Sequence, residues 1–224
     1  MKKSKNTFLI ILTLLLSIPM SYSQQTKMAS SSEIGEGSIN VLVQHNVANY
    51  ATWKMAYKKD MKRRTKAGIR EKLLLRDINN ANYITVVFEI ENLEIAKVFF
   101  LDPYSAKLME AAGVTSKPNF LYFKTSKATA PIGTSMLFVQ HTVKDYDYWK
   151  REFDKHHNVR SKYNIALTTL GVNIENPLNV VALFSSVSPD NILDFLNKSD
   201  LKEAMKNAGI TSKPIQEVLV LDEK

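Results

Sequence analysis

The sequence contains no cysteine among its 224 residues. This absence excludes disulfide bonds, thiolate nucleophiles, cysteine metal ligands and a lipid anchor on cysteine. The fold must therefore be held by a packed core. The hydrophobic share of 45% is sufficient for one, and a mature chain of about 200 residues can form one large domain or two smaller ones.

Long hydrophobic runs are also missing. The apolar run from Phe8 to Leu16 is too short to cross a bilayer, because a spanning helix needs roughly 20 residues. Lysines precede this run, and the small-residue pattern Ser21-Tyr22-Ser23 follows it. A basic start, a short apolar stretch and a small-residue exit are typical of a secretory signal peptide, whereas a retained anchor fits less well. We expect residues 1–23 to be this signal and the protein to be periplasmic or secreted.

Several catalytic motifs do not occur either. We find no P-loop, dinucleotide-binding glycine pattern, nucleophile elbow or zinc-binding helix motif, which disfavours nucleotide-dependent chemistry and triad hydrolysis. His156 and His157 lie near Asp154, but adjacent histidines on a helix point in different directions and rarely bind one metal ion together. We expect no metal and no cofactor.

The charge of the chain is positive, with a formal net value of +8, and three of the lysines lie in the expected signal peptide. Much of the excess falls in one segment, residues 58–66. A basic helix can bind nucleic acid, but without interleaved aromatic residues a solvated helix face is the better interpretation. We expect no nucleic-acid partner, and no membrane partner once the signal is removed.

The chain is an internal duplication. A shift of 96 positions aligns the segment 43–54, which contains Gln44, His45, Tyr50 and Trp53, with the segment 139–150. The same shift aligns 112–118 with 208–214 without a gap. Two copies with so long a period indicate two small domains instead of a solenoid. We expect a flexible leader at 24–39, a first repeat at 40–125, a linker at 126–134 and a second repeat at 135–224.

Each copy has the same expected order of elements, βαββαβ. Periodicity and β-branched residues predict strands near 41–47, 70–78, 82–90 and 119–125, with counterparts in the second copy. Helices should begin after Asn49 and Asn92, which are good N-caps. We expect the second helix of each copy to break near Pro103 or Ser199 and to end at a glycine.

This order predicts an α+β fold, in which each copy is a ferredoxin-like four-stranded antiparallel sheet with both helices on one face. The other face would be apolar, since strands such as residues 179–184 are hydrophobic on both sides. Such a face needs a partner. We expect the two copies to pack sheet to sheet, giving a monomer with an intramolecular pseudo-dimer.

Gln44-His45, Tyr50, Trp53 and Arg64, with the segment 112–118 and the counterparts in the second copy, resemble the dimeric α+β barrel superfamily. That superfamily includes proteins similar to antibiotic biosynthesis monooxygenases and cyclases. The resemblance covers nearly the whole mature chain. It implies a tandem barrel, and it specifies the fold better than the reaction.

His45 and His141 are the candidate catalytic bases, because histidine can move a proton near neutral pH. His45 shares a strand face with Val43 and Val47, so a hydrogen-bonded core histidine is the structural alternative. Gln44 and Gln140 point to the opposite face. One of the two pairs should line the space between the sheets, and the sequence does not say which.

The candidate substrate-binding residues also come in pairs. An aromatic stripe at helical spacing consists of Tyr50, Trp53, Tyr146 and Trp149. It can pack the helix on its sheet or form a wall for a ligand. Arg64 and Arg160 follow the stripe and can bind an anionic substrate or the last carbonyls of their own helix.

The resemblance favours a cofactor-independent oxygenase, isomerase or cyclase that acts on an apolar small molecule, with one histidine as base. Two alternatives stay open. One is a non-catalytic protein that holds a hydrophobic ligand, and the other is a haem-binding barrel. If there is one working site, it belongs to one copy, and the sequence does not identify it.

Overall fold

The structure is a computed structural model that describes residues 37–222. The expected signal peptide and most of the expected leader lie outside the described residues. Each repeat has four strands and four short helices. The first repeat contains β1 (Ile39–Asn46), α1 (Tyr50–Lys59), α2 (Met61–Lys66), β2 (Ile69–Asp77), β3 (Tyr83–Ile90), α3 (Leu93–Leu101), α4 (Pro103–Ala111) and β4 (Asn119–Ala128). The second contains β5 (Ser135–Thr142), α5 (Tyr146–Lys155), α6 (His157–Lys162), β6 (Ala166–Asn173), β7 (Asn179–Ser186), α7 (Pro189–Leu196), α8 (Leu201–Asn207) and β8 (Ile215–Leu221).

The helices begin at the predicted caps. The side chain of Asn49 accepts a hydrogen bond from the Thr52 amide, and that of Asn92 accepts one from the Ile95 amide. Asp145 and Ser188 cap α5 and α7 in the same way. Each of these bonds satisfies an amide that the first helical turn leaves without a partner.

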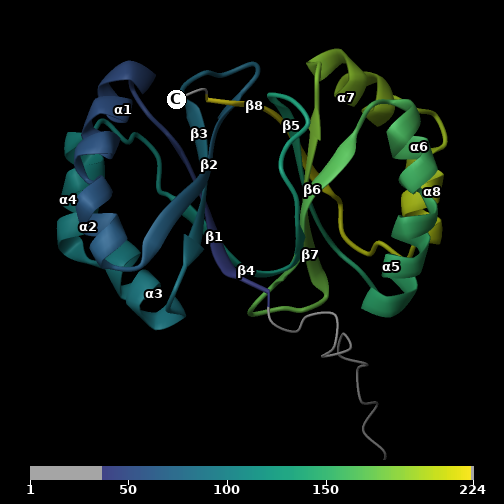
Figure 1. The fold of residues 1–224 in the computed structure, drawn as a ribbon, viewed down its shortest axis with the longest axis horizontal. Coiled ribbons are helices and arrows are strands. Elements are labelled where there is room, and N and C mark those ends of the chain that lie inside the picture. Colours follow the sequence, from purple (N-terminus) through teal and green to yellow (C-terminus); the bar gives the residue numbers. More distant parts are fainter. Residues whose placement is uncertain (1–36, 223–224) are drawn as a thin grey trace, which may run out of the picture.

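The eight strands form one closed barrel in the order β1-β3-β2-β8-β5-β7-β6-β4 (Figure 1). Within each repeat the strands pair as an antiparallel ferredoxin-like sheet. Two seams join the repeats: β2 pairs with β8 over Leu75–Asp77, and β4 pairs with β6. The α+β fold and the packing of the two copies against each other are as predicted. The edge strands of one sheet are hydrogen-bonded to the edge strands of the other across these two seams, so the barrel has no free edge.

The inside of the barrel is an apolar core. Both repeats contribute to it, with Leu42, Leu75, Val87, Leu121, Phe123, Met136, Phe138, Val181, Leu183 and Leu219 all buried. Two further cores lie outside the barrel, between each sheet and its own helices (Figure 1). Successive strand residues point to opposite faces, so one strand serves both an inner and an outer core.

Several boundaries differ from the prediction, beginning with β1, which starts at Ile39 within the expected leader. β4 continues to Ala128 because it pairs with β6, so Ser126, Lys127 and Ala128 of the expected linker are in a strand. The first helix of each repeat is broken, at Asp60 and at His156. The expected breaks in the second helix are present before Pro103 and around Ser199. No helix within residues 37–222 is long and apolar enough to cross a bilayer.

Candidate functional site

A pocket lies between the sheet and the helices of each repeat, outside the barrel. The first-repeat pocket has a volume of about 360 Å³ and is lined by His45, Trp53, Tyr57, Arg64 and Phe88, among others. The second-repeat pocket has a volume of about 150 Å³ and is lined by the equivalent His141, Trp149, Phe153, Arg160 and Phe184. The duplication therefore brings one histidine, one tryptophan and one arginine of the predicted site together twice.

The histidines face the helices and not the barrel interior. His45 is buried on the outer face of β1 with Val43, and Val47, just after the strand, is buried as well. The ring centroid of His45 lies 5.6 Å from that of Trp53. Neither ring nitrogen of His45 or of His141 has a hydrogen-bond partner among residues 37–222. The hydrogen-bonded core histidine that the sequence offered as an alternative is therefore not what the described residues form.

Burial keeps both imidazoles neutral. Desolvation lowers the pKa of His45 from 6.5 to about 4, and it does the same for His141. The charged imidazolium loses its hydration in an apolar pocket, and no described carboxylate replaces it. At neutral pH each ring therefore presents one nitrogen that can accept a proton or a hydrogen bond.

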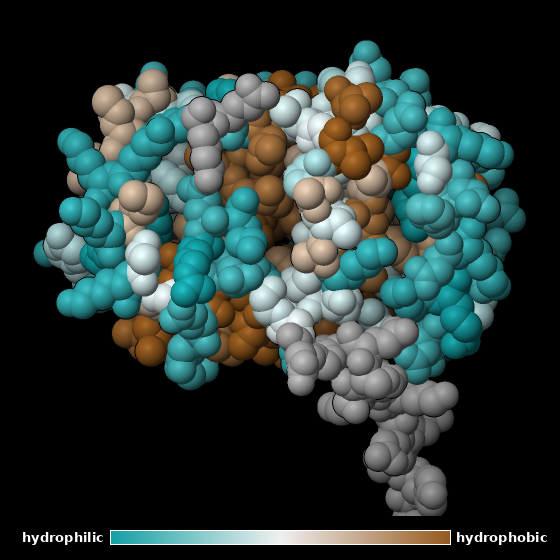
Figure 2. Space-filling view, viewed as in Figure 1, coloured by the Kyte–Doolittle hydropathy of each residue, from teal (hydrophilic) through white to brown (hydrophobic). Residues whose placement is uncertain are grey.

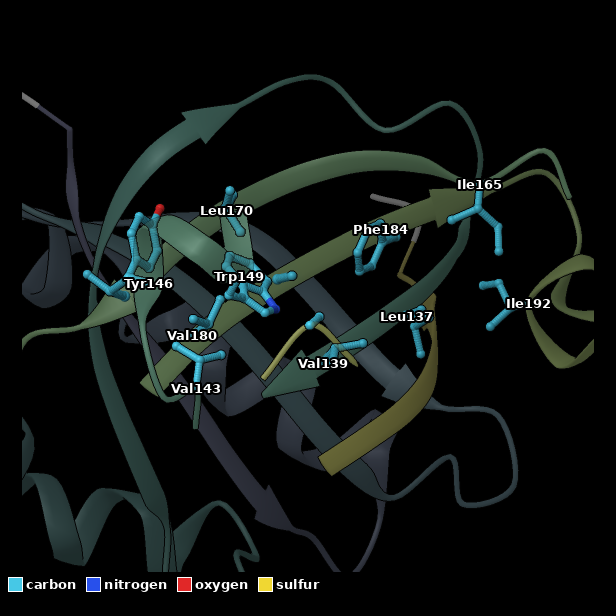
Figure 3. Close-up of a cluster of buried hydrophobic side chains, with 13 residues drawn as sticks. Leu137, Val139, Val143, Tyr146, Trp149, Ile165, Leu170, Val180, Phe184 and Ile192 are labelled. Atoms are coloured by element: carbon cyan, nitrogen blue, oxygen red, sulfur yellow. The ribbon is translucent and has the colours of Figure 1, made fainter. Parts of the chain in front are cut away.

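In each pocket an aromatic wall runs from the histidine to the arginine. Trp53 stacks on Tyr57 with ring centroids 4.7 Å apart, and the Arg64 guanidinium lies 3.8 Å from the Tyr57 centroid. In the second repeat Trp149 stacks on Phe153 at 4.8 Å, and Arg160 lies 4.1 Å from the Phe153 centroid. Figure 3 shows the second-repeat cluster, with Trp149 over the strand that carries Val180 and Phe184. The wall offers flat apolar surface for a planar molecule.

The two arginines are buried in the same way. Each donates a hydrogen bond to a backbone carbonyl near the end of the preceding helix: Arg64 to Tyr57 at 2.8 Å and Arg160 to Phe153 at 2.9 Å. A bond to the last carbonyls of its own helix was the structural alternative for each arginine. Because the helix is broken, the carbonyl belongs to α1 or α5, whereas the arginine lies on α2 or α6. Desolvation lowers the pKa of both guanidinium groups, that of Arg160 to about 10.

The two arginines differ in their carboxylate neighbours. Arg64 lies 3.6 Å from Asp60, and Glu71 accepts a hydrogen bond from the hydroxyl of Tyr57 beneath it. The second repeat has His156 and Leu167 at the equivalent positions. Among the described residues no carboxylate forms an ion pair with Arg160, because Asp154, whose charge supports its protonated form, pairs with Lys150 instead. Arg160 is thus a buried cation without an ion-pair partner among the described residues, which favours an anionic ligand group beside it. Lys198 and Asp200 also line this pocket and pair with each other.

The other predicted site residues lie outside these pockets. Gln44 and Gln140 point into the barrel: Gln44 donates to Glu217 at 2.5 Å and to Thr85 at 3.2 Å, and Gln140 donates to Asn179 at 2.7 Å. Tyr50 packs against Arg76, whose guanidinium lies 4.3 Å from its ring centroid. Tyr146 is buried in the outer core of the second repeat. These side chains hold the fold, and the histidine pair lines the pockets.

Several pocket residues were absent from the predicted site. Tyr57 and Phe153 continue the aromatic stripe four residues after each tryptophan, so helical spacing could have found them. Phe88 and Phe184 come from β3 and β7, and Phe99 and Phe195 from α3 and α7. No local pattern connects these segments, although the duplication pairs each residue with its counterpart. Within the described residues, no group of three or more potential ligand side chains could hold a metal ion.

The fold and the paired pockets define a dimeric α+β barrel in which one chain supplies both halves. Solved structures with this fold include a monooxygenase-like protein from Lactobacillus acidophilus (14% identity, 84% of this chain and 95% of that chain covered, TM-score 0.55). An anthrone oxidase-like protein (10%, 85% and 93%, TM-score 0.56) and a haem-binding protein from Thermus thermophilus (8%, 84% and 92%, TM-score 0.53) are also similar. At these identities the likeness shows the fold alone. No protein-family model matches the sequence, and no curated protein matches it.

Proposed function

We propose that the chain is an exported enzyme of the cofactor-independent monooxygenase, isomerase or cyclase type, acting on an apolar aromatic small molecule. One observation carries the proposal: in each repeat a buried imidazole, without a hydrogen-bond partner among the described residues, lines an aromatic pocket. A buried polar group without a partner is costly to stability. A ligand that donates a proton or a hydrogen bond to the imidazole would offset that cost.

The three reaction types share a first step, the removal of a proton from an activated carbon or hydroxyl. His45 or His141 would accept that proton while the tryptophan and its neighbour hold the ring system flat. The pKa near 4 makes the imidazole unprotonated at neutral pH but a weak base. The substrate anion formed beside the new imidazolium would raise this pKa, because opposite charges stabilise each other in an apolar site.

The pockets differ in what they can hold. Ligand pockets usually measure about 300–1,000 Å³, and only the first-repeat pocket, at about 360 Å³, falls in that range. A cavity of about 150 Å³ accommodates a molecule the size of benzene, which matches the second-repeat pocket. We therefore assign turnover to the first repeat with His45 as base. The second pocket, with Arg160 lacking an ion-pair partner among the described residues, would bind a small aromatic anion.

The chain offers a reporter in each pocket, since Trp53 and Trp149 are its two tryptophans. In the mature protein, Trp149→Phe leaves fluorescence from the first pocket, and Trp53→Phe leaves fluorescence from the second. We expect benzoate to quench Trp149 fluorescence and not that of Trp53. Arg160→Met should weaken this binding at least about tenfold, because it removes the charged partner of the carboxylate. Quenching that persists in Arg160→Met would contradict an anion site at this arginine.

Turnover is tested with anthrone, the compound that appears in the name of one of the similar structures. Its activated carbon loses a proton to give an aromatic anion. In air we expect anthraquinone, measured by absorbance, with dissolved O2 as the oxidant and water as the second product. We also expect a loss of about 10²-fold or more with His45→Ala, and near-unchanged activity with the matched His141→Ala. Binding without turnover would support the ligand-binding alternative. A Soret band in the purified protein would overturn the cofactor-independent assignment.

A further inference from the structure

The helix layer of the first repeat exposes a stripe of apolar side chains. Ile95 is 53% exposed, Val98 71%, Leu101 70% and Tyr104 58%. They follow one another at intervals of three residues along α3 and the start of α4, and we refer to them as the α3 patch. Figure 2 shows hydrophobic surface at the lower edge of the left half, where α3 lies in Figure 1. Because α3 also buries Ala96 and Phe100, it is apolar on nearly all sides, as expected of a helix with a partner on each face.

The second repeat is an internal control for this feature. Its residues equivalent to the α3 patch are all polar: Asn191, Asp194, Asn197 and Asp200. The exposed Met55 and Met61 on the neighbouring helices of the first repeat likewise correspond to Arg151 and His157. The fold therefore does not require apolar residues at these positions.

Positive charge accompanies the apolar residues. Residues 50–66, which include α1 and α2, carry seven basic residues and one acidic residue, whereas the equivalent 146–162 carry five and three. The exposed Lys58, Lys59, Lys62 and Lys66 form no ion pair with any described residue. Arg63 connects the two features, since its guanidinium lies 3.9 Å from the ring centroid of Phe99 and 5.5 Å from that of Tyr104. Apolar and basic residues thus share one outer surface.

We propose that this surface docks the protein onto an anionic lipid membrane. Apolar side chains that enter the acyl boundary, together with lysines that face anionic headgroups, are the combination by which peripheral proteins bind membranes. A second protein would need acidic groups around an apolar centre. The helix layer of the second repeat has acidic groups without an apolar patch, so a second copy of this chain is a poorer fit. Nothing in the sequence alone indicated a membrane partner, because this surface emerges only when α2, α3 and α4 pack side by side.

Docking would also place a pocket at the lipid. Tyr104 of the α3 patch, Phe99 and Arg63 all line the first-repeat pocket. With the patch on the membrane, the rim of this pocket faces the bilayer, where apolar aromatic molecules concentrate. The substrate class would then be a molecule dissolved in the membrane. This last step rests on the proposed function, whereas the docking does not.

The test uses the mature protein and sedimenting vesicles of phosphatidylcholine, with and without about 30% phosphatidylglycerol as the anionic lipid. We expect binding to the anionic vesicles that falls as NaCl rises from about 0.05 to about 0.5 M, because screening shortens the reach of the lysines. Val98→Asp with Leu101→Asn installs the residues of the second repeat. It should weaken binding by roughly tenfold or more, since two apolar side chains no longer enter the lipid.

The matched control is Val187→Asp, which places a charge on an exposed apolar residue of the second repeat outside the patch. It should bind vesicles as the wild type does. Equal binding of the wild type and the Val98→Asp/Leu101→Asn variant would overturn the proposal. So would a wild-type dimer in sedimentation equilibrium that this variant converts to a monomer, because a second copy would then cover the patch. Failure of the anthrone assay with vesicle binding intact would remove the enzyme proposal and leave the docking.

Discussion

Burial changes the protonation of His45 and His141. Each imidazole lies against a tryptophan, with its nitrogens unpartnered among the described residues, and its pKa falls from 6.5 to about 4. An unfolded chain would bind a proton at each histidine more readily than the folded chain does. The two histidines therefore link the stability of the fold to pH.

This linkage makes the fold less stable at acid pH. Between about pH 6.5 and 4 the unfolded state holds more protons at these histidines, so the free energy of unfolding decreases as the pH falls through that window. We expect a loss of about 2–3 kcal/mol per histidine between about pH 7 and 4.5, measured by urea unfolding. His45→Leu with His141→Leu should remove this part of the pH dependence. An unaltered dependence in that variant would show that the histidines do not cause it.

Arg64 and Arg160 occupy equivalent positions in the two repeats but differ in their ion pairing. Their backbone hydrogen bonds and aromatic contacts are the same. A change of Asp60 to His156 and of Glu71 to Leu167 leaves one cation paired and the other without an ion-pair partner among the described residues. A duplicated fold can therefore keep its packing while the charges around one pocket change.

At the scale of elements, α3 and α7 are the same helix of the duplicated fold with different surfaces. Both are capped by a side chain and both bury one face on their sheet. Their outer faces were free to diverge, because exposed positions contribute little to packing. The fold therefore does not require the apolar outer face of α3, since α7 carries polar residues at the same positions.

The end of α4 provides a test of local backbone geometry. Gly113 has φ +84°, and the nearest atom to an added Cβ would be Ala48 Cβ at 3.8 Å, so space is available. Gly113→Ala should therefore cost only the strain of a left-handed backbone, about 1–2 kcal/mol in the free energy of unfolding. Gly209, with φ +79° and comparable space, is the matched position. A cost below about 0.5 kcal/mol at both would mean that the helix end rearranges.

At the scale of the whole molecule, the two repeats are halves of one barrel. Its inner core contains residues from both, and two strand seams connect them. Separation of the halves would expose that core and two rows of backbone groups to water. The covalent connection at residues 129–134 is by comparison a short surface segment.

This predicts the outcome of a cut in the connection. A protease site introduced at Thr129–Ala130, both exposed, should give two fragments that separate under denaturing conditions and elute together at the mass of the intact chain under native conditions. The uncut protein is the control. Fragments that elute apart without denaturant would contradict a single cooperative barrel.

The sequence by itself determined the duplication, the order of elements in each copy and the caps that start the helices. Periodicity and side-chain capping depend on residues close in sequence, and the repeat is found by aligning the chain with itself. None of these patterns needs a tertiary contact to be recognised. It also determined that His45 shares a face with Val43 and Val47, because strand residues alternate.

Only the tertiary structure decided which face was the inner one. The barrel interior is filled by the face that carries Gln44 and Leu42, and the pockets lie on the other face, beneath the helices. Which face is inner depends on how distant strands close on each other, and both faces of these strands are apolar, so alternation alone cannot distinguish them. The joining of the α3 patch to the lysines has the same origin, since it depends on how α2, α3 and α4, from different segments of the chain, pack together.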